Sequence, residues 1–396
     1  MLPNHCQTIL NKLPSHRLLA LDVLRGITIA AMILVNNPGS WSYMYWPLKH
    51  AHWHGLTPTD LIFPFFIFIV GISITLSVSA MRAKGVSQYS ILKSGMIRTV
   101  KLIALGWFLA LFYYNFRDPN FSWVDERLLG IRVMGVLQRI GLVYIIALTC
   151  YLYLKPKHIT FTFVSLLTGY SALMMYTPYS LPNGEIVQGL WLYGNNLSAW
   201  FDNLLLGAKH VYYGNAQPFA FDPEGLLSTL PAIATALSGV LCGFYLRAEK
   251  NLNKQIKVFI IVAMVAIICG YSLSSITPIN KALWTPSYVM ISSGLAMLCY
   301  ALCSYILDIR KIRLWSAPFL VFGANAILFF MFAGVSARIL IMIPIGDSNL
   351  KGVIYTNLLQ PMMGNYLGSF AFSLLFLLIS YLVMFACYKR GIFWKV

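Results

Sequence analysis

Apolar runs of about twenty residues recur along the whole chain, and this feature limits it to very few folds. An α-helix rises 1.5 Å per residue, so such a run crosses the roughly 30 Å hydrocarbon core of a bilayer. The composition is 59% hydrophobic and 10% charged, with a mean hydropathy of +0.71, which leaves too much apolar surface for one globular core. The runs lack the alternation of a membrane β-barrel. The sequence therefore predicts an all-α, polytopic integral membrane protein.

About ten transmembrane helices are predicted, since the apolar runs separate at turn residues and charges. They cover residues 18–36, 61–80, 99–116, 133–154, 159–177, 226–246, 258–276, 284–306, 316–338 and 366–388. No low-complexity linker or internal repeat divides the chain, so residues 1–396 are predicted to form one domain. The longest connection, residues 179–224, contains several turn signals and is expected to lie over an outward-facing cavity.

The formal net charge of +17 indicates orientation in a membrane and not nucleic-acid binding. Most lysines and arginines fall in the connections on one side of the predicted spans, and most acidic residues fall on the other side. The positive-inside rule then places both termini in the cytoplasm. We expect a multi-pass protein of a bacterial inner membrane, with anionic membrane lipid as a general partner and no nucleic acid.

Three histidines precede the second span, in "LKHAHWHGLTPTDLIFPFFIFIVG" from Leu48 to Gly71. One interpretation is a metal site of His50, His52 and His54 with Asp60 as fourth ligand, although this spacing is not specific for zinc. A second is that the imidazoles lie at the membrane interface beside tryptophans. A third is that one histidine acts as a general base or acyl carrier, because imidazole exchanges protons near neutral pH. The residues alone leave these interpretations open.

Other polar residues at membrane depth need a partner, a water-filled cavity or a function. Asp22 and Arg25, three residues apart, are expected to form an ion pair on one helix face, or Arg25 assists a phosphate-bearing ligand. Arg139, in "GVLQRIG", is expected either to extend toward the interface or to line a pocket. Asn36 ends the first span, where it either caps the helix or donates to an oxyanion opposite His50.

Several segments together resemble one family. They are "LDVLRGITIAAMILVNN", "KHAHWHGLTPTDLIFPFFIFIVG", "GVLQRIG", "FDPEGLLSTLPAI", "NKALWTPSYV" and "YKRGIFWKV". In this order, from about Arg17 to Val396, they resemble the heparan-alpha-glucosaminide N-acetyltransferase family of transmembrane acyltransferases, including its bacterial members. The resemblance implies an enzyme that moves acetyl from cytoplasmic acetyl-CoA to the amine of a glucosamine-type sugar on the periplasmic side.

The resemblance also implies roles for individual residues. It places the catalytic histidine on His50 and its companion on Asn36, and it implies acetyl-CoA as donor with no metal. Asp60, Asp222 and Glu224 are candidates for binding the sugar or orienting the imidazole, and helix capping at the starts of spans two and six is the alternative. The candidates for binding the CoA phosphates are Arg25, Arg98, Lys101 and Arg247. The alternative for each of them is that it only contributes to the positive-inside bias.

Two other classes of protein remain as alternatives. An inner-membrane transporter of amino sugars or N-acetylglucosamine would also have ten spans with buried charge, and Pro64 and Pro231 are expected to interrupt spans as in broken transporter helices. A scaffold that gathers partner proteins explains the spans but not the buried polar residues. The acceptor sugar, a homodimeric state and the choice between a ping-pong and a ternary-complex mechanism stay open at the level of sequence.

Overall fold

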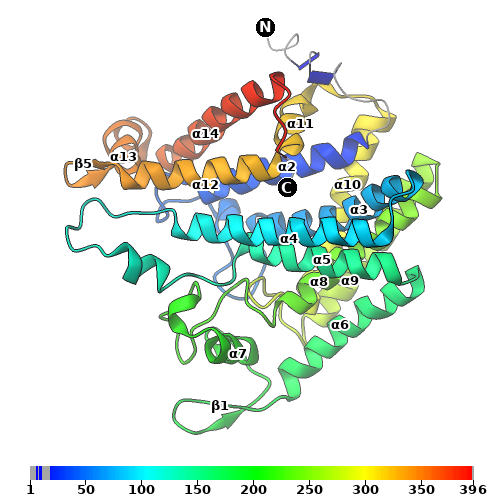
Figure 1. The fold of residues 1–396 in the computed structure, drawn as a ribbon, viewed down its shortest axis with the longest axis horizontal. Coiled ribbons are helices and arrows are strands. Elements are labelled where there is room, and N and C mark those ends of the chain that lie inside the picture. The colour runs from blue at the N-terminus through cyan, green and yellow to red at the C-terminus, as the bar shows by residue number, and fades with distance from the viewer. Residues whose placement is uncertain (1–5, 8, 11–17, 395–396) are drawn as a thin grey trace.

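The computed structural model describes residues 6–7, 9–10 and 18–394, which form a bundle of α-helices (Figure 1). The long helices are α2 Leu19–Asn36, α3 Ile62–Ala83, α4 Gln88–Leu111, α5 Val136–Tyr153, α6 Pro156–Tyr176, α8 Thr229–Ala248, α9 Leu252–Leu273, α10 Pro286–Ser304, α12 Ala326–Met342 and α14 Gln360–Lys389. The short helices are α7 Leu197–Leu205, α11 Ala317–Ala324 and α13 Leu350–Val353. Single 3-10 or π turns are η1 Trp46–Leu48, η2 Pro58–Leu61, η3 Val124–Leu128, η4 Ala208–His210, η5 Tyr305–Ile309, η6 Leu314–Ser316 and η7 Ile354–Leu359.

Strands are few and short in the described residues. They pair as three two-stranded antiparallel hairpins: β1 Tyr179–Ser180 with β2 Ile186–Val187, β3 Trp191–Leu192 with β4 Asn195–Asn196, and β5 Pro344–Ile345 with β6 Ser348–Asn349. All of them lie in connections between long helices. The prediction of an all-α fold is confirmed.

The spans agree with the membrane prediction. Within the described residues, nine helical segments are long and apolar enough to cross a bilayer, and α11 with α12 makes a tenth if this bent pair counts as one span. We call the face at which α2 begins the first face and the opposite one the second face. The outermost helices α4, α6 and α9 carry exposed apolar side chains along most of their length, as helices in contact with lipid should.

The structure changes several details of the prediction. Helix α4 begins at Gln88, about three turns before the predicted span, because its first turns are polar and escape a search for apolar residues. The expected interruptions at Pro64 and Pro231 are wrong: both prolines lie in the first turn of their helices, where no backbone N–H is required. The break occurs instead at Asn325, where α11 and α12 meet at 76°.

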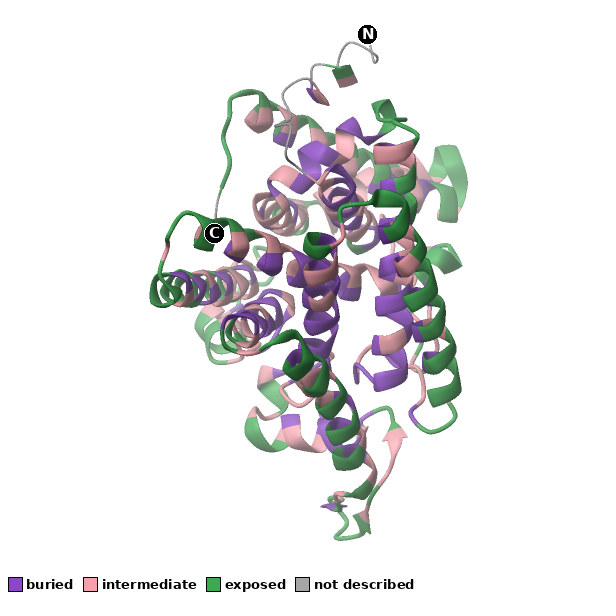
Figure 2. Cartoon of the chain, turned by 90° about the vertical axis from the view of Figure 1, so that its right-hand side faces the viewer, coloured by how far each residue is buried: buried purple, intermediate pink, exposed green. Residues whose placement is uncertain are grey.

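Close packing of α3 against α8 sets the centre of the bundle. A Cβ at Gly71 would lie 2.0 Å from the carbonyl oxygen of Ala236, and a Cβ at Gly239 would lie 2.1 Å from that of Phe68. Small residues on facing helices allow this approach of the two backbones. Buried residues accordingly concentrate on the inner helices in Figure 2, while exposed residues follow the outer ones. The chain segments that precede α3 and α8 on the second face are thereby placed beside each other.

Candidate functional site

His50 and Asp60 form a hydrogen-bonded pair on the second face. His50 Nδ1 lies 2.7 Å from Asp60 Oδ1. The side chain of Asp60 is 1% exposed and that of His50 is 49% exposed, so the carboxylate is fixed in the protein while the ring reaches open space. A carboxylate that accepts from Nδ1 favours the tautomer whose Nε2 is free to accept a proton. The pair therefore has the geometry of a general base.

The local sequence explains why Asp60 is held in place. Thr57 and Asp60 form a capping box at the start of η2, the turn that leads into α3. Asp60 Oδ2 accepts hydrogen bonds from the Thr57 backbone at 3.0 Å, the Thr57 hydroxyl at 2.9 Å and the backbone of Ala51 at 3.0 Å. Asp60 thus caps a helix and orients His50 at once, which joins two roles that the sequence left as alternatives.

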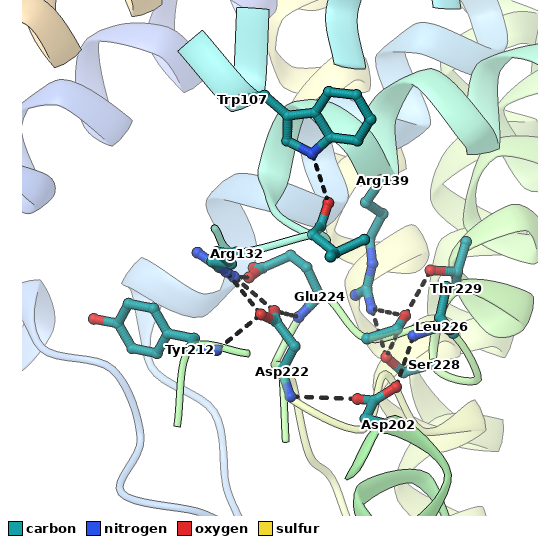
Figure 3. A network of polar contacts seen from close by, with 12 residues as sticks. Trp107, Arg132, Arg139, Asp202, Tyr212, Asp222, Glu224, Leu226, Ser228 and Thr229 are labelled. Carbon is teal, nitrogen blue, oxygen red and sulfur yellow. Dashed lines mark hydrogen bonds and ion pairs between the residues drawn. The ribbon is translucent and has the colours of Figure 1, made fainter. Parts of the chain in front are cut away.

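A second polar cluster, shown in Figure 3, ties the segment before α5 to the segment before α8. Arg132 Nε and Nη2 donate to the two carboxylate oxygens of Asp222 at 2.7 and 2.6 Å, and Nη2 lies 2.5 Å from Glu224 Oε2. Asp222 and Glu224 are 2% and 8% exposed. Burial opposes ionisation of Glu224, but the charges of Arg132 and Arg139 outweigh it and hold the pKa of Glu224 below its ordinary value. These two acids bind an arginine and do not cap α8.

Arg139 and Asp202 bind the backbone around Asp222 and Glu224. Arg139 is fully buried. Its guanidinium donates to the carbonyl of Gly225 at 3.0 Å and to the hydroxyl of Ser228 at 2.5 Å, and it lies 5.1 Å from the centre of the Trp284 ring. The expectation that Arg139 extends to the interface or lines a pocket is therefore wrong, because buried acceptors fix it inside the protein. Asp202 accepts from the backbone of Leu226, and burial raises the pKa of Asp202 to about 7.

A cavity of about 200 Å³ lies between the two clusters (cavity 2). Its wall includes His50, Asp60, Arg132, Glu224 and Lys281. His52, Trp53 and three tyrosines of the connection 179–224 complete much of the rest: Tyr193, Tyr212 and Tyr213. The cavity therefore collects a general-base pair, three further charged side chains and an aromatic wall on the second face.

Lys281 is the closest cation to the His50 ring in this wall. Its Nζ lies 3.1 Å from Nδ1 and 3.4 Å from Nε2 of His50, and 3.7 Å from Asp60 Oδ1. Burial lowers the pKa of Lys281, although the charges of Asp60 and Glu224 oppose this shift. His54, by contrast, packs toward Asn280, with 3.5 Å between His54 Nδ1 and the Asn280 amide, and its burial lowers its pKa. His50 and His54 thus have separate surroundings.

A larger cavity of about 410 Å³ lies inside the bundle (cavity 1). Along α3 its wall runs from Phe63 to Ser77, which at 1.5 Å per residue is about 21 Å of the bilayer. Arg25 and Arg98 contribute cationic groups to the wall, and Arg25 pairs with Asp22 at 3.2 Å as predicted and donates to Ser73 at 2.7 Å. The Nε of Arg98 is buried without a hydrogen-bond partner among the described residues. A ligand with anionic groups at one end fits these features.

A third cavity, of about 330 Å³, lies between the other two (cavity 3). It shares Val136, Leu137 and Phe330 with cavity 1, and Arg132 and Tyr212 with cavity 2. The three cavities therefore follow one another through shared walls, from the arginines in the bundle to His50 on the second face.

The structure does not gather all predicted site residues. His50, Asp60 and Glu224 line cavity 2, and Asp222 binds its wall residue Arg132. Asn36 is the exposed last residue of α2 and is not part of the wall of cavity 1, 2 or 3.

Only some of the predicted CoA-binding residues lie in the wall of a cavity. Arg25 and Arg98 line cavity 1, whereas the exposed Lys101 and Arg247 do not, and Arg247 donates to the Tyr151 hydroxyl at 3.3 Å.

Sequence reasoning missed Arg132 and Lys281 as site residues. Lys281 lies within "NKALWTPSYV", and Arg132 lies three residues before "GVLQRIG". A basic residue on the side poor in positive charge was the available signal, because the positive-inside bias gives it no role there.

Comparison with known proteins adds an independent finding. The sequence model described as "Heparan-alpha-glucosaminide N-acetyltransferase, catalytic" matches residues 17–276. The heparan-alpha-glucosaminide N-acetyltransferase of Mus musculus is 30% identical over 364 residues, which cover 80% of this chain and 53% of that protein. The Homo sapiens protein of the same description is 31% identical over 362 residues, covering 80% and 52%. The chain spans about half the length of these curated relatives.

Proposed function

The chain belongs to the heparan-alpha-glucosaminide N-acetyltransferase family, and on this premise we propose that it is a transmembrane N-acetyltransferase. In this proposal acetyl-CoA enters cavity 1 from the cytoplasm at the first face, and the acetyl group reaches the amine of a glucosamine-type sugar in cavity 2 on the periplasmic side. The observation that carries the proposal is the position of the His50 and Asp60 pair at the end of three cavities that share walls. The expected location is a bacterial inner membrane, with both termini in the cytoplasm.

The reaction requires a base because the attacking amine must be neutral. The amine nitrogen attacks the thioester carbonyl carbon, a C–N bond forms, and the C–S bond breaks as the tetrahedral intermediate collapses. Nε2 of His50 takes the proton that the nitrogen loses, and this proton then passes to the departing CoA thiolate, which becomes the thiol and leaves His50 neutral. In the ping-pong form of the same reaction, Nε2 first accepts the acetyl group and then passes it to the amine. Asp60 holds the ring in the competent orientation in both forms.

The surroundings support a donor in cavity 1 and an acceptor in cavity 2. Arg25 and Arg98 provide positive charge for the phosphates of CoA, whose acyl arm then extends past Phe63 toward His50. Cavity 2, at about 200 Å³, is smaller than the roughly 300 Å³ at which pockets for drug-sized ligands begin, so it suits the end of an acceptor. Asp60 and Glu224, with the aromatic wall, are the proposed contacts of the sugar, and Asp222 acts by holding Arg132. A role for Asn36 stays a prediction.

The proposal is tested with purified protein in detergent, acetyl-labelled acetyl-CoA and glucosamine. Wild-type protein should form N-acetylglucosamine, and His50→Ala should lose this activity at unchanged thermal stability. His158→Ala is the matched control because His158 is exposed at the start of α6, remote from the cavities. Equal product from wild type and His50→Ala would remove His50 from the reaction.

Transport of an amino sugar is the second candidate, and the break at Asn325 favours it because transporters often contain discontinuous helices. Uptake of labelled N-acetylglucosamine into vesicles that contain the protein, without any acetylation, would support this alternative and contradict the transferase.

A further inference from the structure

Lys281 lies beside His50, although it comes from a different part of the chain. It lies in the connection between α9 and α10. The backbone of Gly55 donates to the carbonyl of Ile279 at 2.8 Å, and the amide of Asn280 donates to the carbonyl of Trp53 at 2.9 Å. Asn280 is fully buried. The loop that carries His50 and the loop that carries Lys281 therefore form one unit, so the short distance between the two side chains follows from the fold.

The ammonium of Lys281 is available to a ligand, whereas the other cation of the cavity wall is not. The guanidinium of Arg132 is occupied by Asp222 and Glu224. Among the described residues Lys281 makes a single ion pair, at 3.7 Å from Asp60 Oδ1, and its only other polar neighbour within hydrogen-bond distance is the His50 ring. Asp60 is already bound by three donors on its other oxygen. An ammonium has three donors, so Lys281 retains N–H groups for a further acceptor in cavity 2.

We infer that Lys281 donates a hydrogen bond to the oxyanion of the tetrahedral intermediate formed beside His50. This inference rests on the proposed function. When the amine attacks, the carbonyl π electrons move to oxygen, and a cationic N–H about 3 Å away stabilises the new charge. On collapse the electron pair returns, the thiolate leaves and the nitrogen gives its proton to His50, so Lys281 keeps its own proton throughout. Nζ lies 3.4 Å from Nε2, which places it near any carbonyl that Nε2 or a neighbouring amine attacks.

The charges that face Lys281 come from several elements and determine the pH at which it loses its proton. His50 and Asp60 face it from the segment before α3, Glu224 from the segment before α8, and Arg139 from α5. Burial lowers the pKa of Lys281. The negative charges of Asp60 and Glu224 raise this pKa, and the positive charge of Arg139 lowers it. The net shift is downward, so activity should decline with rising pH before an ordinary lysine would deprotonate.

The inference is tested by kinetics of Lys281→Met and Lys281→Arg with acetyl-CoA and glucosamine. Lys281→Met should lower kcat by about 10²–10³, the usual loss for one oxyanion donor, with KM for acetyl-CoA within twofold. Lys281→Arg keeps the cation and should recover at least roughly tenfold of this loss. Its decline in activity should also shift to higher pH, because a guanidinium keeps its proton. Lys209→Met, on the exposed part of the outer connection, is the matched control and should behave as wild type.

Two outcomes overturn the inference alone: a kcat of Lys281→Met within about threefold of wild type, or equal losses in the Met and Arg variants at every pH. Thermal unfolding of each variant separates a catalytic loss from a folding defect. A wild-type protein that forms no product, or a fully active His50→Ala, overturns the proposed function and this inference with it.

Discussion

Replacement of Arg132 by Met tests whether the ion cluster of Figure 3 holds the second-face segments together. Arg132 precedes α5, while Asp222 and Glu224 precede α8. Met keeps the apolar stem of the side chain and removes only the guanidinium. The change leaves the carboxylates of Asp222 and Glu224 buried without their shared cation.

The expected cost follows from burial. Removing one partner of a buried ion pair costs roughly 3–5 kcal/mol, since the remaining charge stays uncompensated. The Arg132 side chain is 27% exposed, so water recovers part of this energy and the lower end, about 3 kcal/mol, is expected. The variant Arg132→Met/Asp222→Asn/Glu224→Gln removes the stranded charges while keeping their shapes, and it should regain more than half of the lost stability.

The assay is unfolding of the protein in detergent, followed by tryptophan fluorescence. Arg117→Met is the matched control, because Arg117 is exposed on the same face and its side chain donates to the carbonyl of Asp347. A loss below about 0.5 kcal/mol for Arg132→Met, or a triple variant no more stable than the single one, would refute the ion-pair account.

Three further predictions concern the donor, the base and pH. Asp60→Asn should lower kcat by roughly 10²–10⁴ with little change in KM for acetyl-CoA, because His50 loses the acceptor that fixes its tautomer, and steady-state kinetics within threefold of wild type would contradict this. Arg98→Met should raise KM for acetyl-CoA about tenfold, the value of a charge-assisted hydrogen bond, whereas Lys93→Met, on an exposed turn of the same helix, should leave it unchanged. Asp202 has a pKa of about 7 in the fold against 3.8 unfolded, so the folded state binds the extra proton. The protonated Asp202 therefore contributes its full stability below about pH 4, and this contribution is lost as pH rises through about 7. Asp202→Asn should flatten this decline in thermal stability with pH. Parallel curves of thermal stability against pH for the two proteins would refute the prediction.

The spans could be predicted because a bilayer fixes both their length and their polarity. The bent span could not, since Asn325 is a single polar residue in an apolar run and its effect depends on distant partners. Its side chain donates to the carbonyl of Ile392 at 2.8 Å and accepts from the backbone of Trp394 at 3.1 Å. The interruptions predicted at Pro64 and Pro231 are wrong for a related reason. The effect of a proline depends on its position within the helix, and apolar runs define helix ends poorly.

The arrangement of the candidate site could be predicted from the sequence where its contacts are local, and it could not be predicted where its contacts join distant segments. His50 and Asp60 are ten residues apart, and the capping box of Thr57 and Asp60 fixes the carboxylate within one turn. Arg132 reaches an acid 90 residues away, and Lys281 lies 231 residues from His50. The charge bias could single out the two basic residues but not their partners, because these pairs arise from the packing of α3, α5, α8 and α10.

Acetyl transfer across a sealed membrane is the most direct test of the account. The protein is reconstituted in vesicles with glucosamine trapped inside and acetyl-labelled acetyl-CoA added outside. Vesicles whose protein exposes the first face to the outside should accumulate labelled N-acetylglucosamine in the lumen while free CoA appears outside, and His50→Ala vesicles should form neither product. Product that forms only when donor and acceptor share one compartment would contradict the passage of an acetyl group from cavity 1 to His50.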